Sequence, residues 1–130
     1  MFRLRQAQLD VCARAAEPDF ERSVMGHLRQ HHSSAVADLA DPVLHRRVRF
    51  GLGRARRYGL TFENNLTAFV AYMFQIAPNF DEHPPILAVL RDETVPPEDR
   101  IDLLLKRIGG EEWISAKRNG DPQRWNEAHG

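Results

Sequence analysis

Apolar side chains recur at helical spacing along most of this chain, and no stretch alternates in the way that strands do. The pattern predicts a first helix over residues 4–16 and a second helix from Pro18 to about His31. Proline fits the first turn of a helix, where the N–H group that it lacks has no partner, but it bends a helix interior. The two segments are therefore either two helices or one kinked helix.

Local signals mark the start of the next two helices. Ser33 and Ser34 suit the capping of a short helix through Leu39, because a hydroxyl accepts a hydrogen bond from a free N–H group of the first turn. Asp41-Pro42 joins a capping carboxylate to a proline at the first helical position. This dipeptide predicts the start of a longer helix.

A glycine and a threonine separate that longer helix from its successor. Gly59 suits the left-handed conformation that commonly ends a helix. Thr61 is placed to cap the following helix, which we expect to run from about Phe62 to Ala77. This helix is apolar on most sides, as is typical of a helix at the centre of a bundle.

The second half of the chain predicts shorter elements. Residues 81–85 have the composition of a loop, and residues 86–91 that of a short helix. A further helix is expected over residues 97–108, ending at Gly109-Gly110.

These elements together predict an all-α fold. We expect residues 1–108 to form a compact single-domain bundle of about five to six helices, and residues 109–130 to form a polar extension of short helices or a partly mobile tail. The length of 130 residues allows one core. The content of 42% hydrophobic and 28% charged residues argues against wholesale disorder.

The chain shows no sign of export or membrane insertion. Charges interrupt the N-terminal segment where the apolar part of a signal peptide would lie. The longest apolar stretch, residues 66–77, is far shorter than the roughly 20 residues of a membrane span. A lone cysteine, Cys12, is typical of a reduced cytoplasmic protein. We therefore expect a cytoplasmic protein with no membrane partner.

The segment between Pro42 and Thr61 contains six arginines and no acidic residue, although the whole chain is formally neutral, with 18 basic and 18 acidic residues. At about 100° per residue, its apolar side chains fall on one helical face. Gly51 lies on the shoulder of that face and would let a neighbouring helix approach closely. The side chains expected to point outward are Arg46, Arg49, Arg56 and Arg57, while Arg47 and Arg54 flank the apolar stripe.

An outward arginine face has three explanations. The first is pairing within the molecule, because the C-terminal half is acidic, and the chain's neutrality favours it. The second is an acidic protein partner, because guanidinium groups suit carboxylates. The third is phosphate or nucleic acid bound by the basic helix 42–58, although a neutral chain without a glycine-rich phosphate loop is not typical of that class. The candidate acidic residues are Asp81, Glu82, Asp92, Glu93, Glu98, Asp99 and Asp102.

No group of residues has the pattern of an enzyme. His27 and His31 share one helical face, but the glutamate that a zinc enzyme places between such histidines is absent. Asp81, Glu82 and His83 form a polar triplet of a kind that loops before prolines commonly carry. We therefore expect a protein that is not an enzyme, with no catalytic residue, no cofactor and no metal ion.

Two tryptophans lie in the polar C-terminal segment. Trp113 and Trp125 can pin this segment to the body of the protein. They can also act as anchors for a partner, because tryptophan is enriched among the residues that dominate binding energy at interfaces.

Four segments carry a family resemblance: FRLRQAQLDVCARAA, FERSVMGHLRQHH, VRFGLGRARRYGLTFENNLTAFVAYMF and PNFDEHPPILAVLRDETVPPEDRIDLLL. Over residues 2–108 the chain is similar to small uncharacterised all-helical bacterial proteins encoded in type VI secretion gene clusters, beside spike proteins and toxic effectors. The segment from Gly109 departs from the family pattern. The most specific matches are Arg57-Tyr58-Gly59 and Phe80-Asp81.

The resemblance implies an accessory role, either holding an effector before loading or neutralising it, and it brings no catalytic residues. We therefore expect a non-enzymatic adaptor or chaperone for a type VI secretion effector or spike component. The alternatives are an immunity protein against a cognate effector toxin and a nucleic-acid-binding protein. The sequence does not indicate the oligomeric state. The residues expected to contact the partner are Arg46, Arg49, Arg56, Arg57, Trp113 and Trp125.

Overall fold

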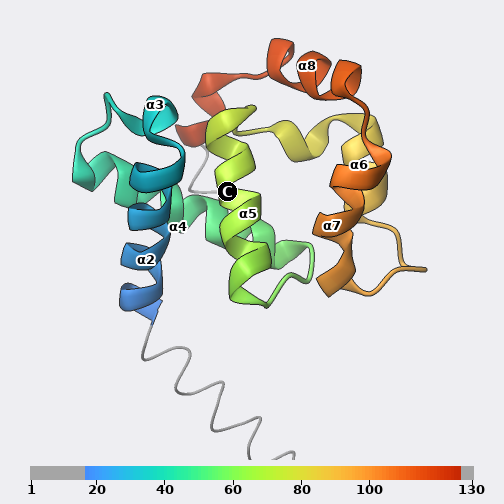
Figure 1. The fold of residues 1–130 in the computed structure, drawn as a ribbon, viewed down its shortest axis with the longest axis horizontal. Coiled ribbons are helices and arrows are strands. Elements are labelled where there is room, and N and C mark those ends of the chain that lie inside the picture. The colour runs from blue at the N-terminus through green and yellow to red at the C-terminus, as the bar shows by residue number, and fades with distance from the viewer. Residues whose placement is uncertain (1–16, 127–130) are drawn as a thin grey trace, which may run out of the picture.

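The computed structural model describes residues 17–126 (Figure 1). No strand occurs among these residues, so the predicted all-α class is confirmed. The predicted helix over residues 4–16 and Cys12 lie outside the described residues. The elements are α2 (Glu17–His31), α3 (Ser33–Val36), α4 (Asp41–Arg57), α5 (Glu63–Gln75), η1 (Phe80–Glu82), α6 (Pro84–Leu90), α7 (Pro97–Arg107), α8 (Gly110–Arg118) and η2 (Pro122–Asn126), where η marks a 3₁₀ helix.

Helix α5 lies at the centre of this arrangement, as its apolar composition predicts. It packs most extensively on α4 and also contacts α3 and α7, and α2 packs on α4 as well (Figure 1). Its buried side chains face in several directions because helices cover it on several sides. They are Asn65, Leu66, Phe69, Val70, Ala71 and Met73.

The contact between α4 and α5 is close at Gly51. This glycine is buried, as expected, and a Cβ atom there would lie 3.0 Å from Met73 Sδ and 3.1 Å from Val70 Cγ2. Such distances are shorter than ordinary van der Waals contacts, so a side chain would push the two helices apart. Gly53, one half-turn further along, has no atom of the described residues within 4 Å of the same position.

Helix α4 ends as predicted. Gly59 adopts the left-handed conformation, with φ 85°, and its N–H group donates to the Arg56 carbonyl oxygen at 3.0 Å. This conformation favours glycine because a Cβ atom is disfavoured there. The chain then turns sharply toward α5.

The predicted side-chain caps are wrong at three helices. No capping hydrogen bond forms at α3, α4 or α5. The cap positions fall one residue away from the predicted ones, at His32, Ala40 and Phe62. Ser33 and Asp41 therefore become the first helical residues, and Thr61 lies one residue too early.

The Asp41 carboxylate binds an arginine of α2 instead of capping α4. Arg29 donates from Nη2 to Asp41 Oδ1 at 2.8 Å and to the Leu39 carbonyl oxygen at 2.7 Å, and from Nη1 to the Val36 carbonyl oxygen at 2.9 Å. The guanidinium group of α2 thus satisfies backbone oxygens in the α3–α4 connection. Asp41 remains favourable in the first turn of α4, because a carboxylate complements the positive end of the helix dipole.

The second half of the chain is more helical than the pattern predicted. The expected loop over residues 81–85 contains η1 and the start of α6 at Pro84, and the glycine pair at 109–110 joins α7 to α8. The described part of residues 1–108 contains six α-helices, in agreement with the expected five to six, and α8 lies in the C-terminal extension. In the C-terminal segment, α8 crosses one end of the molecule and η2 returns toward α4 and α5 (Figure 1).

None of the helices in residues 17–126 combines the length and the apolar character that crossing a bilayer requires.

The two glycines of α4 provide a test of the helix contact. We expect Gly51→Ala to lower the free energy of unfolding by about 1–3 kcal/mol, because the added methyl group overpacks the α4–α5 interface. Gly53→Ala is the matched control, and we expect it to raise stability by about 0.5–1 kcal/mol, because alanine is the better helix former at an open position. Urea denaturation measures both changes. Equal effects at the two positions would contradict the close contact.

Candidate functional site

The outer surface of α4 carries the arginines predicted to face a partner. Arg46 and Arg49 are exposed and line a hollow of about 520 Å³ with Pro42, His45 and Phe50. The Phe50 side chain is half-buried, so an apolar ring lies beside two guanidinium groups. This set of side chains, which we call the α4 hollow, combines positive charge with an apolar contact.

Internal pairing occupies part of the predicted arginine face, but its partners differ from the expected ones. Arg56 forms an ion pair with Glu17 at 2.8 Å, and Arg49 Nε lies 3.4 Å from Glu21 Oε2. Both glutamates belong to α2 rather than to the acidic C-terminal half. The ion pairs among residues 17–126 do not include Arg46.

The C-terminal half pairs instead with Arg54, which the helical wheel placed beside the apolar stripe. Arg54 Nε donates to Asp81 Oδ2 at 2.7 Å, and its Nη2 donates to Glu82 Oε2 at 2.7 Å. The Asp81 side chain is 0% exposed, and Tyr58 donates its hydroxyl hydrogen to the same Oδ2 atom at 2.6 Å. Burial and the hydrogen bond to Asp81 raise the pKa of Tyr58 well above its ordinary value of 10.0, so the hydroxyl stays a neutral donor.

Glu82 extends this network to the C-terminal segment. Arg124 of η2 donates to both oxygens of the Glu82 carboxylate, from Nη1 to Oε1 at 2.7 Å and from Nη2 to Oε2. A bidentate pair of this kind fixes the orientation of both groups. The pair therefore ties η2 to η1, and through Arg54 to the end of α4.

Of the two explanations for Trp125, the structure supports pinning of the C-terminal segment. Its side chain is 7% exposed and contacts the rings of Phe50 and Phe74, with centroid distances of 6.1 and 4.7 Å. The Arg47 guanidinium carbon lies 5.2 Å from the ring centroid, at a distance suited to a cation–π contact. Its own chain therefore covers most of the Trp125 side chain.

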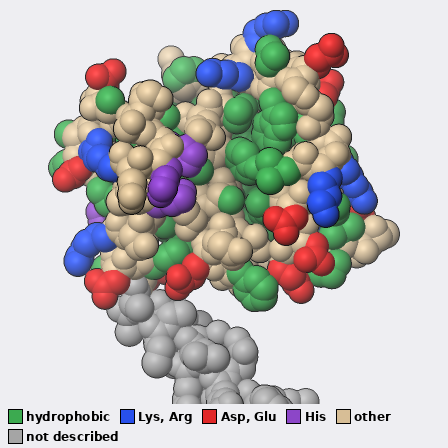
Figure 2. Space-filling model, in the orientation of Figure 1, with side chains coloured by type: hydrophobic (Ala, Val, Ile, Leu, Met, Phe, Trp, Pro, Cys, Tyr) green, Lys and Arg blue, Asp and Glu red, His purple; other side chains and the backbone are tan. Residues whose placement is uncertain are grey.

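Trp113 is less enclosed. Its ring is half-buried and stacks on Tyr72, with a centroid distance of 5.0 Å and an interplanar angle of 21°. Hydrophobic side chains gather on the face of the molecule between α5 and α7 (Figure 2). Trp113 is therefore partly accessible and stays a candidate anchor.

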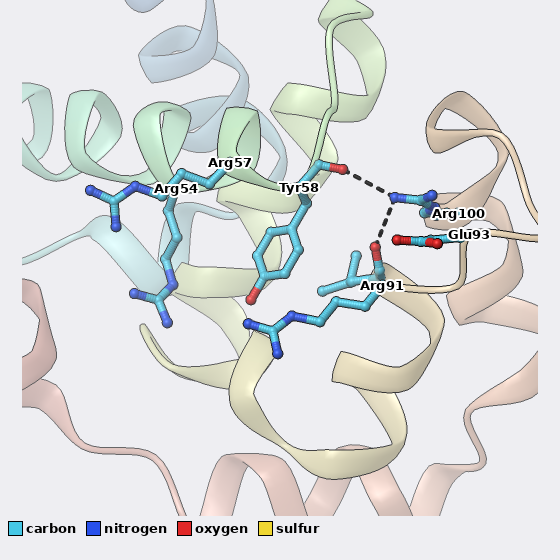
Figure 3. A pocket seen from close by; sticks show the side chains of 7 residues that line it. Arg54, Arg57, Tyr58, Arg91, Glu93 and Arg100 are labelled. Atoms are coloured by element: carbon cyan, nitrogen blue, oxygen red, sulfur yellow. Dashed lines mark hydrogen bonds between the residues drawn. The ribbon is translucent and has the colours of Figure 1, made fainter.

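A second hollow lies where the C-terminal ends of α4 and α6 meet the start of α7 (Figure 3). Its volume is about 560 Å³, and we call it the arginine pocket. Figure 3 shows the guanidinium groups of Arg54 and Arg91 on either side of the Tyr58 hydroxyl. The lining residues are Arg54, Arg57, Tyr58, Leu90, Arg91, Glu93 and Arg100.

Arg100 forms the back of this pocket and is 9% exposed. Its Nη1 donates to the carbonyl oxygens of Tyr58 at 3.2 Å and Leu90 at 3.0 Å, and its Nε donates to the Val95 oxygen at 3.1 Å. Two of these carbonyl oxygens lie at the C-terminal ends of α4 and α6, which are the negative ends of the helix dipoles. They compensate the buried charge of Arg100 without a carboxylate.

The four arginines predicted to face a partner are thus divided. Arg46 and Arg49 line the α4 hollow, Arg57 lines the arginine pocket, and Arg56 pairs with Glu17. Arg91 was not predictable from the sequence, because a lone arginine at a helix end carries no signal of its own.

Arg100 was missed for another reason. Its position next to the two acidic residues in the first turn of α7 suggests a solvent-exposed side chain. Its partners lie on other elements, and only the folded backbone brings their carbonyl oxygens together.

The remaining polar clusters do not converge on one site. In the triplet that precedes Pro84, Asp81 and Glu82 face arginines, whereas His83 Nε2 lies 2.7 Å from Glu112 Oε2 on α8. The rings of His27, His31 and His32 lie close together, on the face shown in Figure 2. Within residues 17–126, no three histidine, cysteine or acidic side chains are arranged to hold a metal ion.

Comparison with known protein families, with curated proteins and with solved structures finds no significant match to this chain.

Asp81 offers a test of the network behind the arginine pocket. We expect Asp81→Asn to lower the free energy of unfolding by about 3–5 kcal/mol, because it leaves Arg54, with a side chain 15% exposed, without its buried counter-charge. The control is Asp38→Asn at an exposed position, expected to change stability by less than about 0.5 kcal/mol. Urea denaturation at neutral pH measures both. A loss below about 1 kcal/mol for Asp81→Asn would show that the pair contributes little.

Glu82 predicts a pH dependence. The hydrogen bond from Arg124, with a further one from Arg54, holds the pKa of Glu82 below its ordinary value of 4.5. A carboxylate with a lowered pKa in the folded state stabilises the fold above pH 4.5, and this contribution is lost as the pH falls through the folded-state pKa. We therefore expect Glu82→Gln to flatten the decline of stability below pH 4.5, measured by urea denaturation at several pH values. The control variant Glu111→Gln should keep the decline of the parent protein, and an unchanged decline in Glu82→Gln would contradict the prediction.

Proposed function

We propose that this chain is a non-enzymatic accessory protein that binds an acidic protein partner through the outer surface of α4. One observation carries the proposal: Arg46 and Arg49 are exposed beside the Phe50 ring in the α4 hollow. Arg46 has no acidic partner among the described residues, so its charge is available to another molecule.

The arrangement suits binding in two stages. Exposed arginines attract an acidic surface over a range of roughly 8 Å at physiological salt, which speeds encounter and orients the partner. The half-buried Phe50 ring then offers an aromatic contact of the kind that carries most of the binding energy, and the half-buried Trp113 is a further candidate contact. Neither step requires a catalytic group.

The type VI secretion context rests on the resemblance of residues 2–108 and makes the proposal more specific. On that basis the partner is a secreted effector or a spike component, and the chain acts as an adaptor or chaperone before export. An immunity protein would use the same surface but would protect cells that express the toxin. An adaptor would change secretion of the effector without preventing its toxicity.

The α4 hollow can be tested with a charge reversal. We expect Arg46→Glu, alone or with Arg49→Glu, to reduce co-purification of the products of adjacent genes by at least about tenfold at low salt, because like charges then face the acidic partner. Lys117→Glu with Arg118→Glu, at exposed positions on α8, makes the same change of charge elsewhere and should leave capture intact. Urea denaturation checks that each variant is folded. Equal loss in both pairs, or no loss in either, would contradict docking at α4.

A further inference from the structure

Two arginines in the wall of the arginine pocket are held in place by hydrogen bonds, and each has N–H donors that these bonds do not use. Arg54 uses Nε and Nη2 for carboxylates, and Arg100 uses Nε and Nη1 for backbone oxygens. Their remaining groups, Nη1 of Arg54 and Nη2 of Arg100, have no acceptor within residues 17–126. Donors whose side chains are already fixed lose little conformational entropy when they bind a ligand.

Arg91 adds a third guanidinium group at the mouth of the pocket. Its side chain is exposed and forms no ion pair with any described residue. Figure 3 shows its guanidinium group directed toward the Tyr58 hydroxyl, in the same space that Arg54 faces. Tyr58 itself donates to Asp81, so the free donors in this space belong to arginines.

We propose that the arginine pocket binds a carboxylate of the acidic protein partner, held by Arg91 together with Nη1 of Arg54, whose guanidinium groups flank the Tyr58 hydroxyl in Figure 3. This inference rests on the proposed function and specifies a second point of contact. The volume of about 560 Å³ lies within the range of small-ligand sites, so the pocket accommodates an acidic side chain with adjoining backbone.

The charge around the pocket favours a carboxylate over phosphate. Glu93 lines the pocket, and the carbonyl oxygens at the ends of α4 and α6 surround Arg100. Asp81 and Glu82 offset the charge of Arg54 from behind. The net positive charge that a ligand meets is therefore modest, and it suits a single negative charge better than the double charge of phosphate near neutral pH.

The test uses the full chain labelled with ¹⁵N at arginine, followed by NMR of the guanidinium N–H groups. The probes are a capped glutamate dipeptide, its glutamine counterpart and inorganic phosphate. We expect the glutamate dipeptide to shift the resonances of Arg54 and Arg91 in a saturable way, and the glutamine dipeptide to shift neither of them.

Two variants change the affinity in opposite directions. Arg91→Gln should raise the Kd for the glutamate dipeptide about tenfold, because it removes a charge-assisted pair. Glu93→Gln should lower the Kd, a gain that loss of folding cannot produce. The control Arg118→Gln removes an exposed arginine outside the pocket and should leave the Kd unchanged.

Several results would overturn the proposal. Shifts without saturation, or an equal effect of Arg91→Gln and Arg118→Gln, would indicate only general charge attraction. Tighter binding of phosphate than of the glutamate dipeptide would assign the pocket to a free anion instead of a protein carboxylate. None of these results touches the capture assay at Arg46 and Arg49, so failure of the pocket and failure of the proposed function are distinguishable.

Discussion

The rest of this structure depends on the contacts that the buried Asp81 carboxylate makes with Arg54 and Tyr58. A charge with no exposure costs several kcal/mol unless partners compensate it, and here Arg54 and Tyr58 do so through a single oxygen. The other oxygen, Oδ1, is buried without a hydrogen bond from the described residues, so the site depends strongly on those two donors. Because Arg54 and Tyr58 belong to the end of α4, the carboxylate sets where η1 meets that helix.

Several consequences for the surface follow from this one contact. Glu82, the next residue, is placed to bind Arg54 and Arg124, and the latter brings η2 back to the body. The fixed positions of Arg54 and Tyr58 in turn shape one wall of the arginine pocket. A structural ion pair therefore orients part of the surface that we propose binds a partner, as supporting hydrogen bonds often do around binding sites.

Features set by neighbouring residues were predictable from the sequence, and features set by distant contacts were not. The periodicity of α4 and α5 and the left-handed Gly59 are local properties, so the pattern alone indicated them. The predicted capping of α4 by Asp41 was wrong, because Asp41 is the first helical residue and its carboxylate binds Arg29 on another helix. For the same reason a helical wheel gave Arg54 a flanking position but could not show that Asp81 lies opposite it.

The arginines of α4 have different roles, which explains how a basic helix occurs in a formally neutral protein. Arg54 and Arg56 are paired with carboxylates, Arg49 lies near Glu21 and Arg47 lies over Trp125, so most of the run has a partner within the fold. The positions that point away from the core, Arg46 and Arg57, are separated by about three helical turns, which corresponds to ~16 Å at ~1.5 Å per residue. A partner that engages both hollows must present acidic groups over a comparable length. A helix or extended segment with spaced carboxylates meets that requirement, whereas one isolated acidic residue reaches a single hollow.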